Sequence, residues 1–197
     1  MPIEIRPLGP SDAAAYQAVR LRGLRESPEA FGSTYDEEIG QSVDVVAARI
    51  TPAGPPVCRV VLGAFDANVL VGIAGCYQES KAKVRHKAVI WGMYVAPEAR
   101  GQRVGRRLLE RAIEAARTWP NVDRVTITVV QHVRAARELY LSVGFELFGA
   151  EPDALRQNGR NDVMEYLSLS LTPAVARQTL TAASQTNARA DASDLPD

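Results

Sequence analysis

The sequence predicts a single α/β (α+β) domain in which a mixed, mostly antiparallel sheet is flanked by helices. The chain has 197 residues, enough for one domain with its own hydrophobic core. Apolar residues make up 46% and charged residues 23%, as in ordinary globular proteins, so the chain as a whole is not disordered. Segments with strand-like and helix-like periodicity are interleaved along the chain, which is typical of a sheet covered by helices.

The first predicted elements are short. Apolar residues alternate roughly over residues 3–8, as in a strand, and two prolines close it. Ser11 or Asp12 then supplies an N-cap for a helix that runs to about Arg25. Residues 27–40 contain proline, glycine and three consecutive acidic residues, and are predicted as a loop with room for one helical turn.

The middle of the chain changes from helical to strand periodicity. A second short helix is predicted over residues 43–50 and is ended by the prolines that follow. β-rich runs come next at 58–65 and 69–77, and Asp66-Ala67-Asn68 between them predicts a hairpin. A further strand is predicted over 88–95.

The second half of the chain alternates between helices and strands. A helix over about 105–119 carries an apolar stripe along one side and is stopped by a proline. Apolar residues then alternate as a strand over 125–129. The next helical stripe spans 135–143, and Gly144 is well suited to end it. The closing strands are predicted at 145–148 and 163–171.

The composition changes at about Thr172. Beyond it, Ala, Ser, Thr, Asp and Gln dominate, with hardly a large apolar side chain. The sequence therefore predicts a domain at 1–171 and a disordered tail at 172–197.

The charge balance excludes several kinds of partner. Lysine and arginine number 23, as do aspartate and glutamate, so the net charge is zero and disfavours a dedicated nucleic-acid or membrane-surface binder. No apolar run reaches the length of a membrane span, and the N-terminus does not resemble a secretion signal, so we expect a cytoplasmic protein. Two cysteines and two histidines are a poor metal-binding set, and no metal is expected.

The two cysteines lie symmetrically about the predicted hairpin. Their positions predict that Cys58 and Cys76 are direct cross-strand neighbours. Such a pair could form a redox switch, but two small core side chains kept reduced are the favoured interpretation.

The segment 95–107 carries the most informative chemistry. A strand ends there, a glycine-containing turn follows, and a helix begins, so successive backbone N–H groups and the positive end of a helix dipole are exposed. Four arginines crowd the same place: Arg100, Arg103, Arg106 and Arg107. Cations at a helix N-terminus cost a few tenths to about 1 kcal/mol each unless an anion is near, and a pyrophosphate would remove this conflict. The alternative is a solvated helix start with an Arg106–Glu110 salt bridge.

Two other glycine-rich phosphate loops do not fit these residues. A Walker loop needs Gly-Lys-Ser/Thr after its spacer, and this sequence has none. A dinucleotide fingerprint needs Gly-x-Gly-x-x-Gly, whereas here Gly101 is followed by glycine only at residue 105.

The segment Arg100-Gly101-Gln102-Arg103-Val104-Gly105 resembles the acetyl-CoA loop of the GNAT superfamily of N-acetyltransferases. Residues 91–98 look like the strand and bulge that precede this loop in the family. Residues 135–145, with Leu139-Tyr140 and Val143-Gly144-Phe145, look like its later helix. The resemblance covers about residues 3–171, and it rests on three motifs in the right order and spacing.

The resemblance implies acetyl-CoA as co-substrate and identifies the residues that bind it. Backbone amides around Met93, Tyr94 and Val95 would bind the pantetheine arm and polarise the thioester carbonyl. The phosphates would lie on the loop and helix start, at Arg100, Gly101, Gln102, Arg103, Val104, Gly105 and Arg106.

Two residues depart from the family pattern. Arg103 replaces the first loop glycine, a residue free to take a positive φ. If the loop keeps its shape with an ordinary φ, Arg103 adds a charge near the phosphates; otherwise cofactor affinity suffers. Val133 stands where the family often has asparagine, so one side-chain contact to the cofactor is expected to be lost.

Tyr140 is the predicted general acid. A phenol with a pKa near 10 can protonate a leaving thiolate, whose thiol has a pKa of about 8.5. Tyr140 also lies on the apolar stripe of its helix, so a purely structural core tyrosine is the alternative.

The general base is not identified by the sequence. The strand at 87–95 contains no carboxylate, so the candidates are an ordered water and five side chains: Glu37, Glu38, Glu79, Glu165 and His86. An α-amine is about a tenth neutral at pH 7, whereas a lysine-like amine is neutral in only about one part in a few thousand. An α-amino substrate could therefore react with water alone as the base.

The predicted function is an acetyl-CoA-dependent N-acetyltransferase that acts on a primary amine of a small molecule or peptide. The alternative is an acyl-CoA-binding sensor with little turnover, which the departures at Arg103 and Val133 would suit. The sequence leaves open the identity of the amine, the length of the acyl chain, and whether the chain forms a homodimer.

Overall fold

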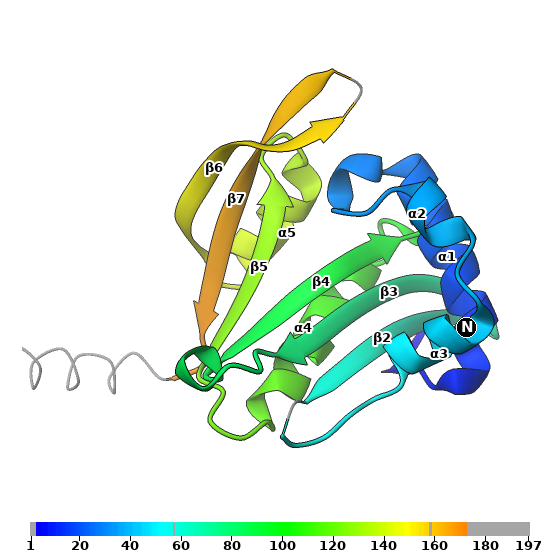
Figure 1. The fold of residues 1–197 in the computed structure, drawn as a ribbon, viewed down its shortest axis with the longest axis horizontal. Coiled ribbons are helices and arrows are strands. Elements are labelled where there is room, and N and C mark those ends of the chain that lie inside the picture. The colour runs from blue at the N-terminus through cyan, green and yellow to red at the C-terminus, as the bar shows by residue number, and fades with distance from the viewer. Residues whose placement is uncertain (1–2, 57, 158, 173–197) are drawn as a thin grey trace, which may run out of the picture.

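The described residues form one seven-stranded sheet covered by helices (Figure 1). The computed structural model describes residues 3–56, 58–157 and 159–172, so the predicted tail lies outside the described residues beyond Thr172. The strands are β1 (Glu4–Pro7), β2 (Arg59–Asp66), β3 (Val69–Gln78), β4 (Lys87–Val95), β5 (Arg124–Val130), β6 (Glu146–Gln157) and β7 (Arg160–Ser170). The helices are α1 (Ala13–Glu26), α2 (Tyr35–Ile39), α3 (Val43–Ile50), α4 (Val104–Arg117) and α5 (Arg134–Ser142).

The sheet has the order β1-β2-β3-β4-β5-β7-β6. Among these described strands, β4 and β5 pair in parallel, and the other neighbouring pairs are antiparallel. The predicted α/β class with a mostly antiparallel sheet is therefore confirmed.

The sheet opens between β4 and β5. The two strands are paired only where Lys87–Val89 meets Arg124–Thr126, and beyond these residues they diverge (Figure 1). On the other side of β4, the register with β3 shifts between Ile73 and Gly75, so that two β4 residues, Gly92 and Met93, lie opposite one residue of β3. Gly92 has a φ of +63°, a conformation that glycine adopts without strain. This bulge bends β4 next to the opening.

Helices cover both faces of the sheet. An added Cβ at Gly72 would contact Leu108 and Val104 of α4, whereas an added Cβ at Gly23 of α1 would contact the Tyr94 ring. Tyr94 lies opposite Ile73, and neighbouring residues of a strand point to opposite faces. The two helices therefore pack on opposite faces. The apolar stripe of α4 is fully buried, as its period predicts.

Local sequence signals placed most elements correctly, with two exceptions near the ends of the chain. Asp12 does precede α1, but its carboxylate does not cap that helix; it accepts hydrogen bonds from Arg6 and from the Gly9 amide. β6 extends to residue 157 rather than 148. Its second half is polar and irregular, so pairing with β7, and not hydrophobic periodicity, makes it a strand.

The predicted pairing of the cysteines is wrong. Cys76 lies opposite Val60, and the Gln78 amide donates to the Cys58 carbonyl. The hairpin turn is shorter than predicted, and a bulge after Ala64 shifts the register further. Both cysteines are buried and free, and burial raises the pKa of the Cys76 thiol to about 12.

None of the helices in the described ranges is long and apolar enough to cross a membrane.

Candidate functional site

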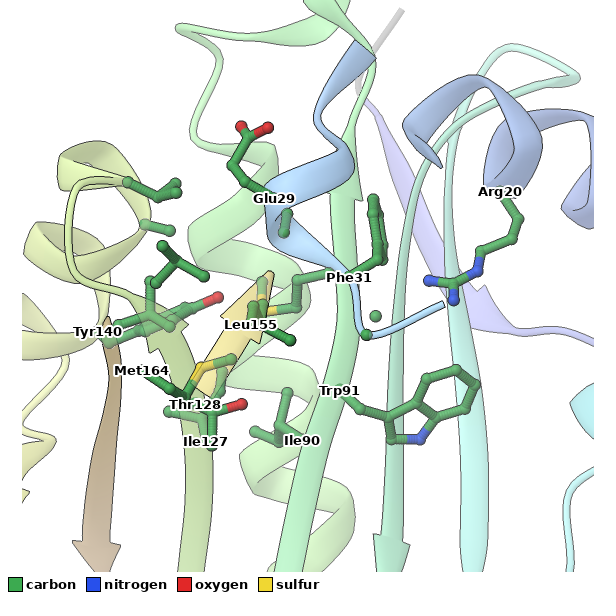
Figure 2. A pocket seen from close by; sticks show the side chains of 18 residues that line it. Arg20, Glu29, Phe31, Ile90, Trp91, Ile127, Thr128, Tyr140, Leu155 and Met164 are labelled. Atoms are coloured by element: carbon green, nitrogen blue, oxygen red, sulfur yellow. The ribbon is translucent and has the colours of Figure 1, made fainter. Parts of the chain in front are cut away.

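A cavity of about 260 Å³ lies in the opening between β4 and β5 (Figure 2). Its walls come from both strands, from α5, from the 3-10 turn η2 (Pro28–Ala30) with the residues after it, and from the β6–β7 pair. Most of the lining is apolar, including Phe31, Ile90, Trp91, Met93, Ile127, Val129, Leu155 and Met164. The lining side chains with polar groups that bear on the chemistry are Arg20, Glu29, Thr128 and Tyr140. The site is thus a small apolar pocket with a few polar groups, as expected for a small-molecule site.

The strand β4 presents backbone groups to this opening. The Ala96 amide donates to the Val71 carbonyl of β3. Because backbone groups alternate sides along a strand, the Tyr94 amide also faces β3, while those of Met93 and Val95 face the opening. Of the three β4 amides expected to hold the pantetheine arm, two therefore face the cavity side. The Tyr94 side chain is buried on α1 instead, where its hydroxyl donates to Glu26.

The loop before α4 leaves its backbone donors free. The N–H groups of residues 101–106 donate to no acceptor within the described part of the chain. Gly101 has a φ of +76°, and α4 begins at Val104, so these groups belong to a tight turn and to the first helical turn. Gly105 lies beside α5, and an added Cβ would contact Leu139 at 3.4 Å, an ordinary van der Waals distance. Free N–H groups at a helix start suit an anion, and the binding of phosphates here stays a prediction.

The four arginines of this region do not all point the same way. Arg107 donates to the Ile3 carbonyl, and so reaches back to the N-terminal strand. Arg106 pairs with Glu110 at 3.4 Å, as predicted, and donates to the last turn of α5. Arg100 folds onto the Val95 carbonyl, and Arg103 is exposed. Not all four charges therefore converge on one ligand.

Arg103 itself adopts the left-handed conformation. Its φ is +60° and it forms the N-cap of α4. The first alternative, an ordinary φ, is therefore wrong, because Arg103 takes the left-handed conformation without being glycine. The second alternative, weaker binding of the cofactor, stays a prediction. For a residue with a side chain, the left-handed conformation costs about 1–2 kcal/mol.

We expect Arg103→Gly to be about 1 kcal/mol more stable than Arg103→Ala, because both lack the charge and only glycine relieves the left-handed strain. Urea unfolding of the two variants measures this difference. Both should bind acetyl-CoA up to about fivefold more weakly than the parent, the scale of one exposed charge. Arg107→Ala is the matched control for affinity, since this side chain reaches Ile3. Equal stability of the glycine and alanine variants would contradict the strain.

Tyr140 lies in the cavity wall. It comes from the last turn of α5, which ends at Ser142 before Gly144 turns the chain with a φ of +100°. The side chain is 6% exposed and packs on Phe145 with ring centroids 6.2 Å apart. Figure 2 shows its hydroxyl directed into the cavity. Burial raises the pKa of Tyr140, so the hydroxyl keeps its proton at neutral pH.

The five side chains considered as the base lie outside this cavity lining. Glu165 is buried against Arg137 at 2.6 Å, and Glu37 caps α2 by accepting from the Thr34 amide. Glu79 lies just beyond the end of β3, and His86 just before the start of β4, away from the opening. Glu38 is buried in an ion-pair network described below.

Two lining residues were missed by the sequence reasoning. Glu29 lines the cavity from η2, and Arg20 lines it from α1. No local pattern assigned a role to either side chain, because tertiary packing places η2 over the opening. Val133, the departure from the family's asparagine, lines the same cavity just before α5 and makes no side-chain cap.

Arg20 belongs to a buried network with Glu38. The guanidinium Nη2 donates to Glu38 at 2.8 Å and to Ser33 at 2.7 Å, and Arg49 Nη1 lies 3.1 Å from the same carboxylate. Burial alone would raise the pKa of Glu38, but hydrogen bonds from Arg20 and Ser33 and the charges of both arginines lower it to about 2. Glu38 therefore stays ionised, and so is an unsuitable base.

Within the described ranges, no group of three or more His, Cys, Asp or Glu side chains is placed so that it could hold a metal ion. That the protein uses no metal stays a prediction.

The comparisons with known proteins agree on one family. A family model described as the acetyltransferase (GNAT) family matches residues 24–145. A search of curated protein sequences gives no match.

Solved structures share the fold at low sequence identity. A GNAT-family acetyltransferase from Streptococcus pneumoniae is 22% identical with a TM-score of 0.76, and the match covers 86% of this chain and 99% of that one. The protein yncA from Salmonella typhimurium, solved with its cofactor acetyl-CoA, is 21% identical with a TM-score of 0.70, over 88% and 96% of the two chains. A phosphinothricin acetyltransferase from Sinorhizobium meliloti, in complex with acetyl-CoA, is 17% identical with a TM-score of 0.71, over 87% and 89%.

Proposed function

Because this chain belongs to the acetyltransferase (GNAT) family, an acetyl-CoA-dependent acyltransferase family, we propose that it acetylates a primary amine of a small molecule or peptide. The observation that carries the proposal is the cavity between β4 and β5, where the Tyr140 hydroxyl and the open side of β4 line the same space. That the acceptor is an amine is part of this proposal. The family and its acetyl donor follow from the matches to known proteins.

The residues present fit acetyl-CoA. The free N–H groups of residues 101–106 at the start of α4 suit the pyrophosphate, with Arg103 and Arg106 beside them. The Met93 and Val95 amides, on the open side of β4, suit the pantetheine arm. When bound, acetyl-CoA supplies an acetyl thioester.

Tyr140 is proposed to protonate the leaving sulfur. The amine nitrogen forms a bond to the acetyl carbon and releases one proton to water, the carbon–sulfur bond breaks, and the sulfur takes the Tyr140 proton. The phenolate then regains a proton from solvent. Burial raises the pKa of Tyr140, so the phenol carries its proton at neutral pH, and the same shift makes it a weaker acid toward the thiolate. The role therefore rests on the position of the hydroxyl in the cavity and not on its pKa.

Glu29 is the proposed partner of the amine. Glu29 is the acidic residue in the described cavity lining, and it is half-buried. A carboxylate there attracts an ammonium group and can accept its proton, directly or through a water molecule.

We expect saturating acetyl-CoA to raise the Tm, because a ligand that binds only the folded state stabilises it by mass action. At about 100 times the Kd the stabilisation is about 2.7 kcal/mol, which corresponds to a rise of roughly 5–10 °C for a domain of this size. Differential scanning fluorimetry measures it. Acetyl-pantetheine, which lacks the nucleotide phosphates, is the control and should act far more weakly. No shift at millimolar acetyl-CoA would contradict the proposed donor site.

Thiol release in the presence of a panel of amines tests the catalytic function directly. Turnover that depends on both acetyl-CoA and an amine supports the acetyltransferase. Binding of acetyl-CoA without thiol release from any amine would support the sensor instead.

A further inference from the structure

Arg20 has a buried nitrogen with no partner, at the edge of the cavity. The side chain is about 6% exposed, and its Nε and Nη2 atoms are engaged by Glu38 and Ser33. Its Nη1 exposes less than 1 Å² and donates to no acceptor in the described part of the chain. A buried donor without an acceptor is costly, so it marks a place where an acceptor is expected to bind.

The geometry points to an anionic acceptor substrate: we propose that the acetylated amine carries a carboxylate that binds Arg20 Nη1, as in an amino acid. This inference rests on the proposed acetyltransferase function and identifies the class of its acceptor.

The unpartnered nitrogen is directed toward the bulge in β4. An added Cβ at Gly92 would lie 3.5 Å from Arg20 Nη1, so the nitrogen is next to the residue that opens the sheet. The guanidinium carbon lies 4.3 Å from the centre of the Phe31 ring. Figure 2 shows the guanidinium between Phe31 and Trp91, with Tyr140 on the opposite side of the cavity. An acceptor held by Arg20 would thus lie across the cavity from Tyr140.

The charges near Arg20 favour an anion. Glu38 is shared by two arginines, Arg20 and Arg49, so this ionised group leaves one positive charge unbalanced. A second cavity, on the α3 side, shares Arg20 and Trp91 with the first and is also lined by Arg59. Arg59 donates only to the carbonyls of Thr51 and Ala48 in its described contacts, so its charge adds to the positive potential.

The cavity lining contains one acidic and one basic side chain, Glu29 and Arg20, whose charges complement those of an amino acid. Glu29 is suited to the ammonium group and Arg20 to the carboxylate. The cavity, at about 260 Å³, is slightly smaller than pockets that hold drug-sized ligands, which favours a compact acceptor. Its lining is otherwise apolar, so an aliphatic or aromatic side chain would be accommodated.

The first experiment uses the wild-type protein and pairs of amines that differ in one group. Glycine, L-leucine and L-phenylalanine are each compared with their carboxamides and their decarboxylated amines, and kcat/KM is measured by thiol release. We expect the best amino acid to exceed its carboxamide by about 10- to 100-fold, the value of one hydrogen bond to a charged group. The amine of an amino-acid carboxamide is less basic than that of the free amino acid, so a larger fraction of it is neutral and reactive. This difference favours the carboxamide and therefore works against the expected result.

The second experiment removes the unpartnered nitrogen. Arg20→Lys keeps a positive charge for Glu38 but has no second terminal nitrogen to offer the ligand. We expect the preference for the amino acid over its carboxamide, measured as the ratio of the two kcat/KM values, to fall by about 10- to 100-fold. Arg49→Lys is the matched control, since Arg49 shares Glu38 but does not line the first cavity. Its preference for the carboxylate should be unchanged.

The outcomes are distinguishable. A thermal shift with acetyl-CoA shows whether Arg20→Lys is folded, and if it is not, the wild-type series decides alone. Equal kcat/KM for amino acids and carboxamides, with clear turnover of either, would overturn the Arg20 proposal and leave the acetyltransferase intact. No turnover of any amine, despite acetyl-CoA binding, would overturn both.

Discussion

Replacement of Tyr140 by phenylalanine is expected to lower kcat by about 10²–10⁴-fold, the usual scale for one positioned general acid. The substitution keeps the ring that packs on Phe145 and removes only the hydroxyl that faces the cavity. The hydroxyl has no acceptor in the described part of the chain, so the free energy of unfolding should change by less than about 1 kcal/mol. Steady-state kinetics and urea unfolding measure the two effects.

Tyr16→Phe is the matched control for this prediction. Tyr16 is also almost fully buried, on α1, but it does not line the cavity. Removal of the Tyr16 hydroxyl should leave kcat near normal. A folded Tyr140→Phe protein with normal kcat would refute the acid role and identify Tyr140 as a structural residue.

The pH dependence of Tyr140 has a definite sign. Burial raises the pKa of Tyr140 above its usual 10. The acid form therefore persists to high pH, so Tyr140 should cause no alkaline decrease in kcat below about pH 10. The same shift makes its contribution to stability complete below the unfolded pKa of about 10 and lost as the pH rises toward the folded pKa.

Replacement of Glu38 by glutamine is expected to reduce the free energy of unfolding by about 3–5 kcal/mol. The change leaves Arg20 buried without its counter-charge, which is the usual cost of breaking a buried ion pair. Hydrogen bonds from Arg20 and Ser33 and the charges of both arginines lower the pKa of Glu38 to about 2, so the network stabilises the ionised carboxylate that glutamine would remove. Glu37→Gln is the control: Glu37 is exposed, and glutamine can keep its cap on α2.

The stability that Glu38 provides should depend on pH. Because its folded pKa is lowered, its contribution is present above the unfolded pKa of about 4.5 and lost as the pH falls toward 2. Urea unfolding at pH 7 and pH 3 measures this. The difference between wild type and Glu38→Gln should be smaller at pH 3, and an unchanged difference would show that Glu38 is not held as a charged group.

The sequence by itself determined most elements of the fold. The apolar stripe of α4 has a period that only a helix satisfies, and the structure places the helix where that period predicts. The strand predicted over residues 88–95 is found as β4, Lys87–Val95. The loop before α4 could also be predicted, because the glycine turn, the helix start and the arginines are neighbours in sequence. These are local features, set by a few consecutive residues.

The local sequence predicted less well those features that depend on strand register or on strand pairing. The position of Cys76 opposite Val60 depends on the short turn and on one bulge, and each of them shifts every later pair. The positive φ of Arg103 depends on the path that the chain must follow between β4 and α4. Glycine is the usual residue there, and its absence gave no indication that arginine would take the same conformation.

Only the tertiary structure decided the composition of the cavity. Arg20 and Glu38 are 18 residues apart, and Arg49 a further 11, so no local pattern shows that they meet. The turn that carries Glu29 reaches the cavity because α1 packs on one face of the sheet while β4 and β5 separate beside it. A buried charge is stable only when other buried polar or charged groups pair with it. Folding brings these partners together, whereas their spacing along the chain does not.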